Sequence, residues 1–179
     1  MAETKKLEET VTLKEGVSAS LEGTILVVKG PNGETRKDFA TDNISLKAES
    51  GKVTITSVRD SKRERKIVGS FKAHITNMMV GVIDGHKVMM KVLSGHFPMT
   101  VTVTGNQFTV KNFLGEKTLK KITIPDGVSV KVKGQEVEIG GVDKETVGNT
   151  ASRIENSTRR TKFDRRIFQD GIVRLIEAK

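Results

Sequence analysis

The sequence contains no cysteine, no tryptophan and no tyrosine among its 179 residues. Without cysteine, the chain has no disulfide bond, no thiolate nucleophile and no thiolate metal ligand. No apolar run approaches the roughly 20 residues of a membrane-spanning helix, and the first residues lack the apolar core of a signal peptide. The sequence therefore predicts a cytoplasmic protein that does not enter a membrane.

Histidine is scarce as well, which bears on catalysis. His74, His86 and His96 are the only histidines, and none stands at the spacing of a metal site or a catalytic triad. The sequence offers no nucleophile with a neighbouring base and no cluster of metal ligands. We therefore expect no enzymatic activity, no metal and no cofactor, and we expect packing or surface roles for the histidines.

Positive charge, by contrast, is in excess: 31 Lys and Arg against 22 Asp and Glu give a net charge of +9. Such an excess favours a polyanionic partner through long-range attraction and counterion release, although basic proteins without such a partner are also common. Residues 1–90 hold 15 basic and 12 acidic residues, whereas residues 91–179 hold 16 and 10. The second half is therefore the better candidate for a nucleic-acid surface.

The chain repeats itself at nearly half its length. Residues 105–121 share a skeleton with a segment that begins at Gly23, at a constant offset of 82 residues. The matching positions are Gly23 and Gly105, Val28 and Val110, Lys29 and Lys111, Gly33 and Gly115, and Glu34 and Glu116. The offset predicts one module built twice, as residues 1–82 and 83–179.

Each half contains two stretches of alternating apolar residues broken by a glycine, which is typical of β-hairpins. These stretches are residues 17–28, 44–55, 99–110 and 128–139. A tight turn is predicted at residues 30–33, because Pro presets φ and Asn or Gly tolerates a positive φ. Residues 1–10 are charged and aperiodic and predict a frayed start. Residues 87–93 predict a further strand between the modules, and residues 171–176 a short one at the end.

After each pair of hairpins the apolar period lengthens to that of a helix. A helix is predicted over roughly residues 61–82, with Ser61 and Glu64 at capping-box spacing, and a second one begins at Asp143. The fold class is therefore α+β, a duplicated module in which a small, mainly antiparallel sheet of two hairpins packs on one helix. The first hairpin also resembles the fourth, so strand likeness alone does not set the register of the repeat, but the shared order of elements does.

Basic residues gather in three places, residues 59–72, 111–121 and 153–166. The first is the outer side of an amphipathic helix, for which a solvated face is an equally good interpretation. The third continues past its helix as Arg-Arg-Thr-Lys-Phe-Asp-Arg-Arg, with hydroxyl side chains beside it that suit phosphate and ribose contacts. The only aromatic rings besides histidine are seven Phe, which argues against stacking of unpaired bases and favours folded RNA read by shape and backbone.

Four ordered motifs carry a family resemblance: Val28-Lys-Gly-Pro-Asn-Gly33, Ser94-Gly-His-Phe-Pro-Met99, Asn112-Phe-Leu-Gly-Glu-Lys117 and Phe168-Gln-Asp-Gly-Ile172. Over nearly the whole chain, the sequence resembles the archaeal and eukaryotic branch of large-subunit ribosomal protein six, a universal family whose eukaryotic members are numbered nine. The resemblance implies a duplicated α+β fold, which agrees with the repeat, and a structural protein that binds 23S-type rRNA chiefly through its C-terminal domain. It also implies a place near the sarcin-ricin region and the base of the factor-binding stalk, beside other large-subunit proteins. Residues 59–66 are shorter than the basic insertion of eukaryotic members, which favours an archaeal source.

The leading hypothesis is therefore rRNA binding by the second module, residues 83–179. The candidate phosphate-binding residues, chosen from charge and from the region that the family uses, are Lys117, Lys120, Lys121, Arg153, Arg159, Arg160, Lys162, Arg165 and Arg166. Contacts to about six phosphates predict a log–log salt slope of affinity near −5. The alternative hypothesis is a free-standing protein-interaction scaffold with a solubilising basic surface. Neither hypothesis implies a membrane or a small-molecule substrate.

Overall fold

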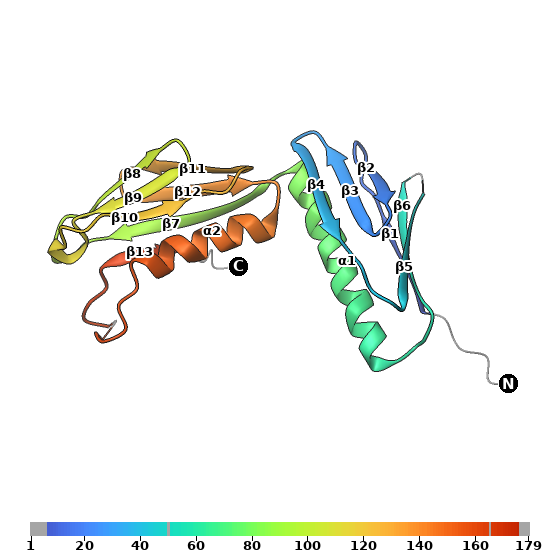
Figure 1. Cartoon of the computed structure of the whole chain (residues 1–179). Helices are drawn as coiled ribbons and strands as arrows, with labels where there is room; N and C mark the ends of the chain where they lie inside the picture. Colours follow the sequence, from blue (N-terminus) through green and yellow to red (C-terminus); the bar gives the residue numbers. More distant parts are fainter. Residues whose placement is uncertain (1–6, 50, 165, 176–179) are drawn as a thin grey trace. The chain divides into compact units, whose positions relative to one another are not determined.

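The computed structural model describes residues 7–49, 51–164 and 166–175. The chain divides into two compact units, Met1–Gly85 and His86–Lys179, coloured from blue to green and from green to red in Figure 1. Each unit combines antiparallel sheets with one long helix, so the predicted α+β class and the duplicated module are confirmed.

The described part of the first unit consists of six strands followed by one helix. Its elements are β1 (Leu7–Thr12), β2 (Ser18–Glu22), β3 (Ile25–Gly30), β4 (Gly33–Asp38), β5 (Ile44–Glu49), β6 (Lys52–Ser57) and α1 (Lys62–Ile83). The strands form two antiparallel sheets, ordered β1-β6-β5 and β2-β3-β4.

The second unit runs through the same order and then adds to it. Its elements are β7 (His86–Leu93), β8 (Thr100–Thr104), β9 (Gln107–Lys111), the short 3₁₀ helix η1 (Phe113–Gly115), β10 (Lys120–Thr123), β11 (Val128–Lys133), β12 (Glu136–Gly141), α2 (Lys144–Ser157) and β13 (Gly171–Arg174). The sheets are ordered β10-β9-β8 and β11-β12-β7-β13, all antiparallel.

Strand pairing makes the duplication explicit. The sheet β1-β6-β5 has the same order as β7-β12-β11, and β2-β3-β4 has the same order as β8-β9-β10. Each module therefore holds two small sheets, where the sequence predicts a single sheet of two hairpins. Alternation of apolar and polar residues predicts where strands occur, but it does not predict which hairpins pair in the same sheet.

Two strands, β1 and β7, differ from the sequence prediction. Residues 7–10, predicted to be frayed, belong to β1, which pairs along its whole length with β6. The charge of Glu9 obscures the alternation, because this residue lies on the partly buried face and its carboxylate meets Lys72 Nζ of α1 at 2.8 Å. The predicted strand between the modules is β7, which is the counterpart of β1 and lies inside the second unit's larger sheet.

The central strands β3 and β9 are enclosed on both faces. In each, three consecutive residues are buried, 26–28 in β3 and 108–110 in β9, because both faces of these strands are covered and the alternation is lost. At the end of β3, α1 approaches so closely that a Cβ placed on Gly30 would lie 2.8 Å from Val82 Cγ2. Only glycine leaves room for this helix position.

The helices begin where side chains can satisfy their first backbone N–H groups. The Ser61 hydroxyl accepts a hydrogen bond from the Arg63 amide at the start of α1. The Asp143 carboxylate accepts from the amides of Glu145 at 3.1 Å and Thr146 at 3.0 Å at the start of α2. Such caps typically contribute about 1 kcal/mol each.

Candidate nucleic-acid interface

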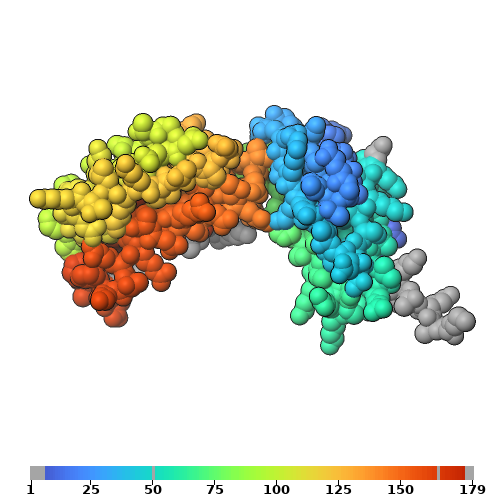
Figure 2. All heavy atoms as spheres, viewed as in Figure 1, coloured from blue at the N-terminus to red at the C-terminus, as the bar shows by residue number. Residues whose placement is uncertain are grey.

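Three of the four motif segments converge at one end of the second unit. They are the segment before β8, the connection between β9 and β10, and the segment between α2 and β13. We call residues 94–99, 112–119, 159–164 and 166–170 together the loop surface. In Figure 2, the red atoms that follow α2 lie beside the yellow atoms of the β9–β10 connection.

Asp170 joins two segments of the loop surface, residues 94–99 and the residues just before β13. Its side chain is 5% exposed and accepts hydrogen bonds from the amides of Gly95 at 2.5 Å and His96 at 3.1 Å, and it also pairs with His96 Nδ1. Burial acts to raise the pKa of this carboxyl group, but the bonds from the ring and amide of His96 and from Gly95 outweigh it, so the pKa lies below its usual value. Asp170 therefore stays ionised and fixes segment 94–99 against β13.

The β9–β10 connection also contacts segment 94–99 of the loop surface. The connection spans eight residues, 112–119, whereas its counterpart between β3 and β4 spans two. Asn112 and Leu114 adopt left-handed backbone conformations with φ of 58° and 51°, and the Asn112 side chain donates to the Pro98 carbonyl at 2.9 Å. Strained backbone of this kind persists only where surrounding contacts hold it.

The longer connection also shifts the repeat. Val28 pairs with Thr35 in the first unit, and its counterpart Val110 pairs with Lys120 in the second. Thr35 and Lys120 are 85 positions apart, so the offset of 82 ends at this turn. Gly115 matches Gly33 in sequence, but it lies inside the enlarged connection instead of starting a strand.

The structure brings two of the predicted basic groups together through one carboxylate. Glu116 Oε2 lies 3.7 Å from Lys120 Nζ, and Glu116 Oε1 accepts from Arg160. Lys120 also donates to the Ser157 carbonyl at 3.0 Å and lies 4.2 Å from the centroid of the Phe113 ring. Lys120 is thus partly buried, and its main effect is to hold β10 against the end of α2.

Arg166 is engaged within its own turn. Its guanidinium and its amide both donate to Asp164, each at 2.9 Å, and the side-chain bond lowers the pKa of the Asp164 carboxyl group. The other predicted cations are exposed, and within the described residues none of them forms an ion pair: Lys117, Lys121, Arg153, Arg159 and Lys162. Arg165 lies outside the described residues. The five exposed cations are those most available to an anionic ligand.

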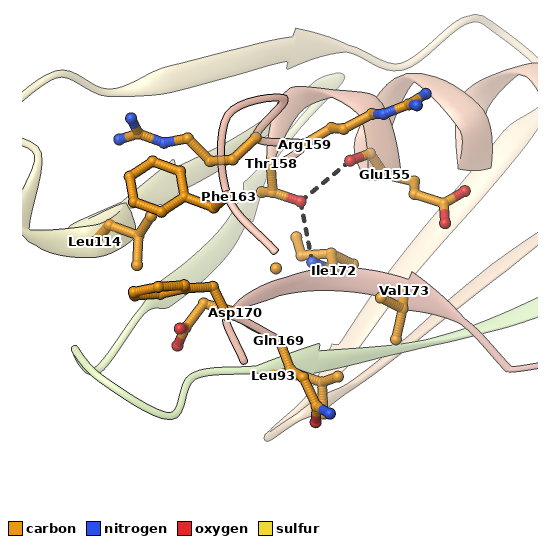
Figure 3. Close-up of a pocket in the computed structure, with 13 residues that line it drawn as sticks. Leu93, Leu114, Glu155, Thr158, Arg159, Phe163, Gln169, Asp170, Ile172 and Val173 are labelled. Atoms are coloured by element: carbon orange, nitrogen blue, oxygen red, sulfur yellow. Dashed lines mark hydrogen bonds between the residues drawn. The ribbon is translucent and has the colours of Figure 1, made fainter. Parts of the chain in front are cut away.

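A hollow of about 250 Å³ opens in the loop surface between α2, β13 and η1. Apolar side chains, among them Leu114, Phe163 and Ile172, line it together with the side chains of Arg159 and Arg160. In Figure 3, Phe163 and Leu114 lie across the hollow from Val173. Thr158 supports its wall, because Thr158 Oγ1 accepts from the buried Ile172 amide at 3.0 Å.

Aromatic rings concentrate at this end of the second unit, a feature that composition alone conceals. Phe97, Phe163 and Phe168 are 51%, 44% and 38% exposed. His96 stacks on Phe168, with ring centroids 4.9 Å apart. These rings and Asp170 are absent from the candidate residues predicted from charge. The quoted motifs contain all of them except Phe163, so the motifs themselves were the available signal.

The first basic cluster lies on α1 in the other unit. Arg65 Nε pairs with Asp60 at 2.6 Å and Lys72 with Glu9, while the side chains of Lys62, Arg63 and Lys66 are exposed. This arrangement matches the solvated face that the sequence analysis weighs as one interpretation of the cluster. None of the candidate phosphate-binding residues belongs to this cluster on α1.

Two further properties concern the described residues only. Among them, no group of three or more His, Asp or Glu is placed to hold a metal ion. Neither helix described here has the length and apolar character needed to cross a membrane. The carboxylates of the loop surface are instead paired with cations, His96 or backbone amides, as at Asp170, Glu116 and Asp164.

Comparison with known proteins finds similarity along almost the whole chain. A family model described as ribosomal protein L6 matches residues 14–85 and 97–171, one stretch in each unit. Large ribosomal subunit protein uL6 of Methanosarcina mazei is 38% identical over 168 residues, which cover 94% of this chain and 96% of the relative. Proteins of the same name from Methanospirillum hungatei and Sulfurisphaera tokodaii are 40% and 38% identical over 93% of this chain, and 94% and 90% of their own lengths.

Proposed function

The chain belongs to the ribosomal protein L6 family, and from that premise we propose that it is a structural protein of the large ribosomal subunit. In this proposal it acts in the cytoplasm without catalytic activity and binds 23S-type rRNA chiefly through the module of residues 83–179. The contact lies near the sarcin-ricin region and the base of the factor-binding stalk, beside neighbouring large-subunit proteins.

One observation supports the rRNA assignment. Five exposed cations that form no ion pair within the described part of the chain lie on or next to the loop surface, and hydrogen bonds between its segments hold its backbone. Lys and Arg that neutralise phosphates release counterions, which supplies affinity for a polyanion. Because Arg160 pairs with Glu116 and Lys120 donates to the Ser157 carbonyl, the backbone segments that carry these cations are joined to each other. A fixed set of cations suits folded RNA, whose phosphates also stand at fixed positions.

The test is a salt titration of rRNA binding by the full chain. The probe is transcribed 23S-type rRNA of Methanosarcina mazei, whole and as domain fragments, one of which contains the sarcin-ricin region. The test variant carries Lys117→Ala, Lys121→Ala, Arg159→Ala and Lys162→Ala. Since each phosphate contact contributes about 0.7–0.9 to the log–log salt slope, we expect the slope to become shallower by roughly three.

A matched variant removes the same charge from the first unit through Lys47→Ala, Lys52→Ala, Lys62→Ala and Lys66→Ala. All four positions are exposed, so both variants should keep the fold and have the same net charge. We expect the first-unit variant to retain nearly the wild-type slope. Equal losses in the two variants would contradict the assignment to the second module, and a wild-type slope in both would contradict rRNA binding through these cations.

The free-standing interaction scaffold is tested separately by sedimentation of cell lysate. The proposed function predicts that the protein migrates with large subunits through a high-salt wash. A predominantly soluble pool would instead support the scaffold. Preference for the fragment with the sarcin-ricin region over the other rRNA fragments tests the finer placement.

A further inference from the structure

We propose that the hollow beside Phe163 and Phe168 receives one unstacked nucleobase of the bound RNA. The inference rests on the proposed function for its partner, and it adds a site and a mode of recognition to it. It starts from two Phe rings that are partly exposed on a loop and in contact with neighbouring rings. Such residues tend to be buried because exposure of their apolar surface to water is unfavourable.

The rings are held in place by contacts on several sides. Phe168 stacks on His96 with an interplanar angle of 24°, and Phe163 meets Phe168 edge to face at 5.0 Å. Asp170 holds His96 through both its ring and its amide. A ring that is fixed before binding loses little conformational entropy when a ligand covers it.

The lining of the hollow has the polarity of a nucleobase. Leu114, Ile172 and the two Phe rings give it apolar walls, and Arg159, Arg160 and Gln169 place donors along its rim. A base likewise has an apolar face and a polar edge, and guanidinium groups pair with base acceptors. Asp170 and Glu155 also line the hollow, but Asp170 is occupied by segment 94–99 and Glu155 Oε2 lies 3.5 Å from Arg174.

An apolar side chain from a neighbouring protein is the competing occupant, and the charge pattern disfavours it. Seating such a side chain would cover Arg159, which lies at the rim and forms no ion pair within the described residues. Burial of an unpaired cation is costly. RNA avoids this cost, because the phosphates that flank an inserted base can meet the same guanidinium.

The scarcity of aromatic residues is compatible with this site. Seven Phe cannot supply the repeated platforms on which single-stranded nucleic acid is stacked, and four of them lie outside this surface or in the core. One pair of rings is nevertheless enough to hold one base that is splayed out of an RNA loop or bulge. The protein then reads RNA mainly by shape and backbone, with one inserted base as a fixed point.

The experiment compares Phe163→Leu, Phe168→Leu and the two Phe→Ala variants of the full chain with wild type, using the same 23S-type rRNA. Loss of one stacking contact should weaken binding about five- to 150-fold at fixed salt. The salt slope should stay at the wild-type value, because no cation is removed. The Leu variants keep an apolar side chain and remove only the ring, so they separate stacking from loss of packing.

Phe97→Ala is the control, since Phe97 is the most exposed ring of this surface and does not line the hollow. We expect it to bind within about twofold of wild type. Ultraviolet crosslinking of the wild-type complex, read by mass spectrometry, should place nucleotide adducts on Phe163 or Phe168. Circular dichroism verifies that each variant is folded.

Wild-type affinity in the Leu variants, or adducts confined to other residues, would overturn the nucleobase site. The proposed function survives that result if the charge-removal variant still flattens the salt slope. If the Phe variants bind rRNA normally but lose a neighbouring protein from reconstituted subunits, the hollow is a protein socket and the proposal is wrong. If neither the charge variants nor the Phe variants change binding, both proposals fail together.

Discussion

Replacement of Thr158 by Val tests how the loop surface is attached to the core. Thr158 is 3% exposed, and its hydroxyl accepts from the Ile172 amide at 3.0 Å and donates to the Glu155 carbonyl at 3.1 Å. Through this group the end of α2 is joined to β13 (Figure 3). Valine has nearly the same shape, so Thr158→Val removes the hydroxyl and little else.

The size of the effect follows from the group left behind. The Ile172 side chain is 1% exposed and its amide bond to Thr158 is buried, so the variant leaves a buried donor without a partner. An unsatisfied buried polar group costs about 1–3 kcal/mol. For a unit of this size, a loss of about 2 kcal/mol lowers Tm by about 8–16 °C.

Thr150→Val is the matched control. Thr150 is 1% exposed and lies on the same helix, but its hydroxyl only donates to the Thr146 carbonyl four residues earlier, so no amide loses its partner. We expect a smaller loss for this variant, about 0.5–1.5 kcal/mol for one hydrogen bond, because no buried donor is left without a partner. Thermal unfolding gives the stabilities, and hydrogen exchange reports the Ile172 amide directly. Equal stability of the two variants, or slow exchange of Ile172 in Thr158→Val, would refute the reasoning.

Two further predictions concern packing and pH. Gly30→Ala places a methyl group against Val82 and should destabilise the first unit by about 1–3 kcal/mol in a denaturant titration. Gly69→Ala lies at an exposed helical position with no neighbour within 4 Å and should stabilise the unit by about 0.5–1 kcal/mol. Effects of the same sign would contradict the close approach of α1. Because the pKa of Asp170 is lowered in the folded state, its contribution is present above the unfolded value of about 4 and lost as pH falls below it. The stability difference between wild type and Asp170→Asn should therefore shrink as pH falls below about 4, and a constant difference would show that ionised Asp170 does not stabilise the fold.

The regular elements could be predicted from the sequence because their causes are local. A period of two marks the hairpins, a longer period marks both helices, and Ser61 and Asp143 mark their starts. The duplication could be predicted because the same local signals recur in order. Strand β1 could not be predicted, because a charged residue, Glu9, lies on its partly buried face. Its charge is neutralised there by Lys72, a partner 63 residues away.

The candidate site was less predictable because its organisation depends on distant pairs. Charge located the cations, but the contact of Arg160 with Glu116 joins residues 44 positions apart and turns one predicted phosphate ligand into a partner of a carboxylate. The role of Asp170 depends on amides 74 and 75 positions away. Composition also gives no sign of the aromatic surface, because the chain contains few rings and three exposed Phe rings lie together only in the folded protein.

The pairing of β13 with β7 has a consequence for the order in which the protein is made. Gly171 pairs with Leu93, which is synthesised 78 residues earlier, so one edge of β7 waits for its partner for roughly 4–16 s at 5–20 residues per second. The segment that carries Arg159 and Lys162 lies between α2 and β13, and it has its final shape only when β13 has docked. A nascent chain that stops short of β13 already carries these charges but lacks the bond from the Ile172 amide to Thr158 that joins the segment to the second unit. Under the proposed function, high-affinity binding of rRNA therefore requires synthesis of the whole second unit.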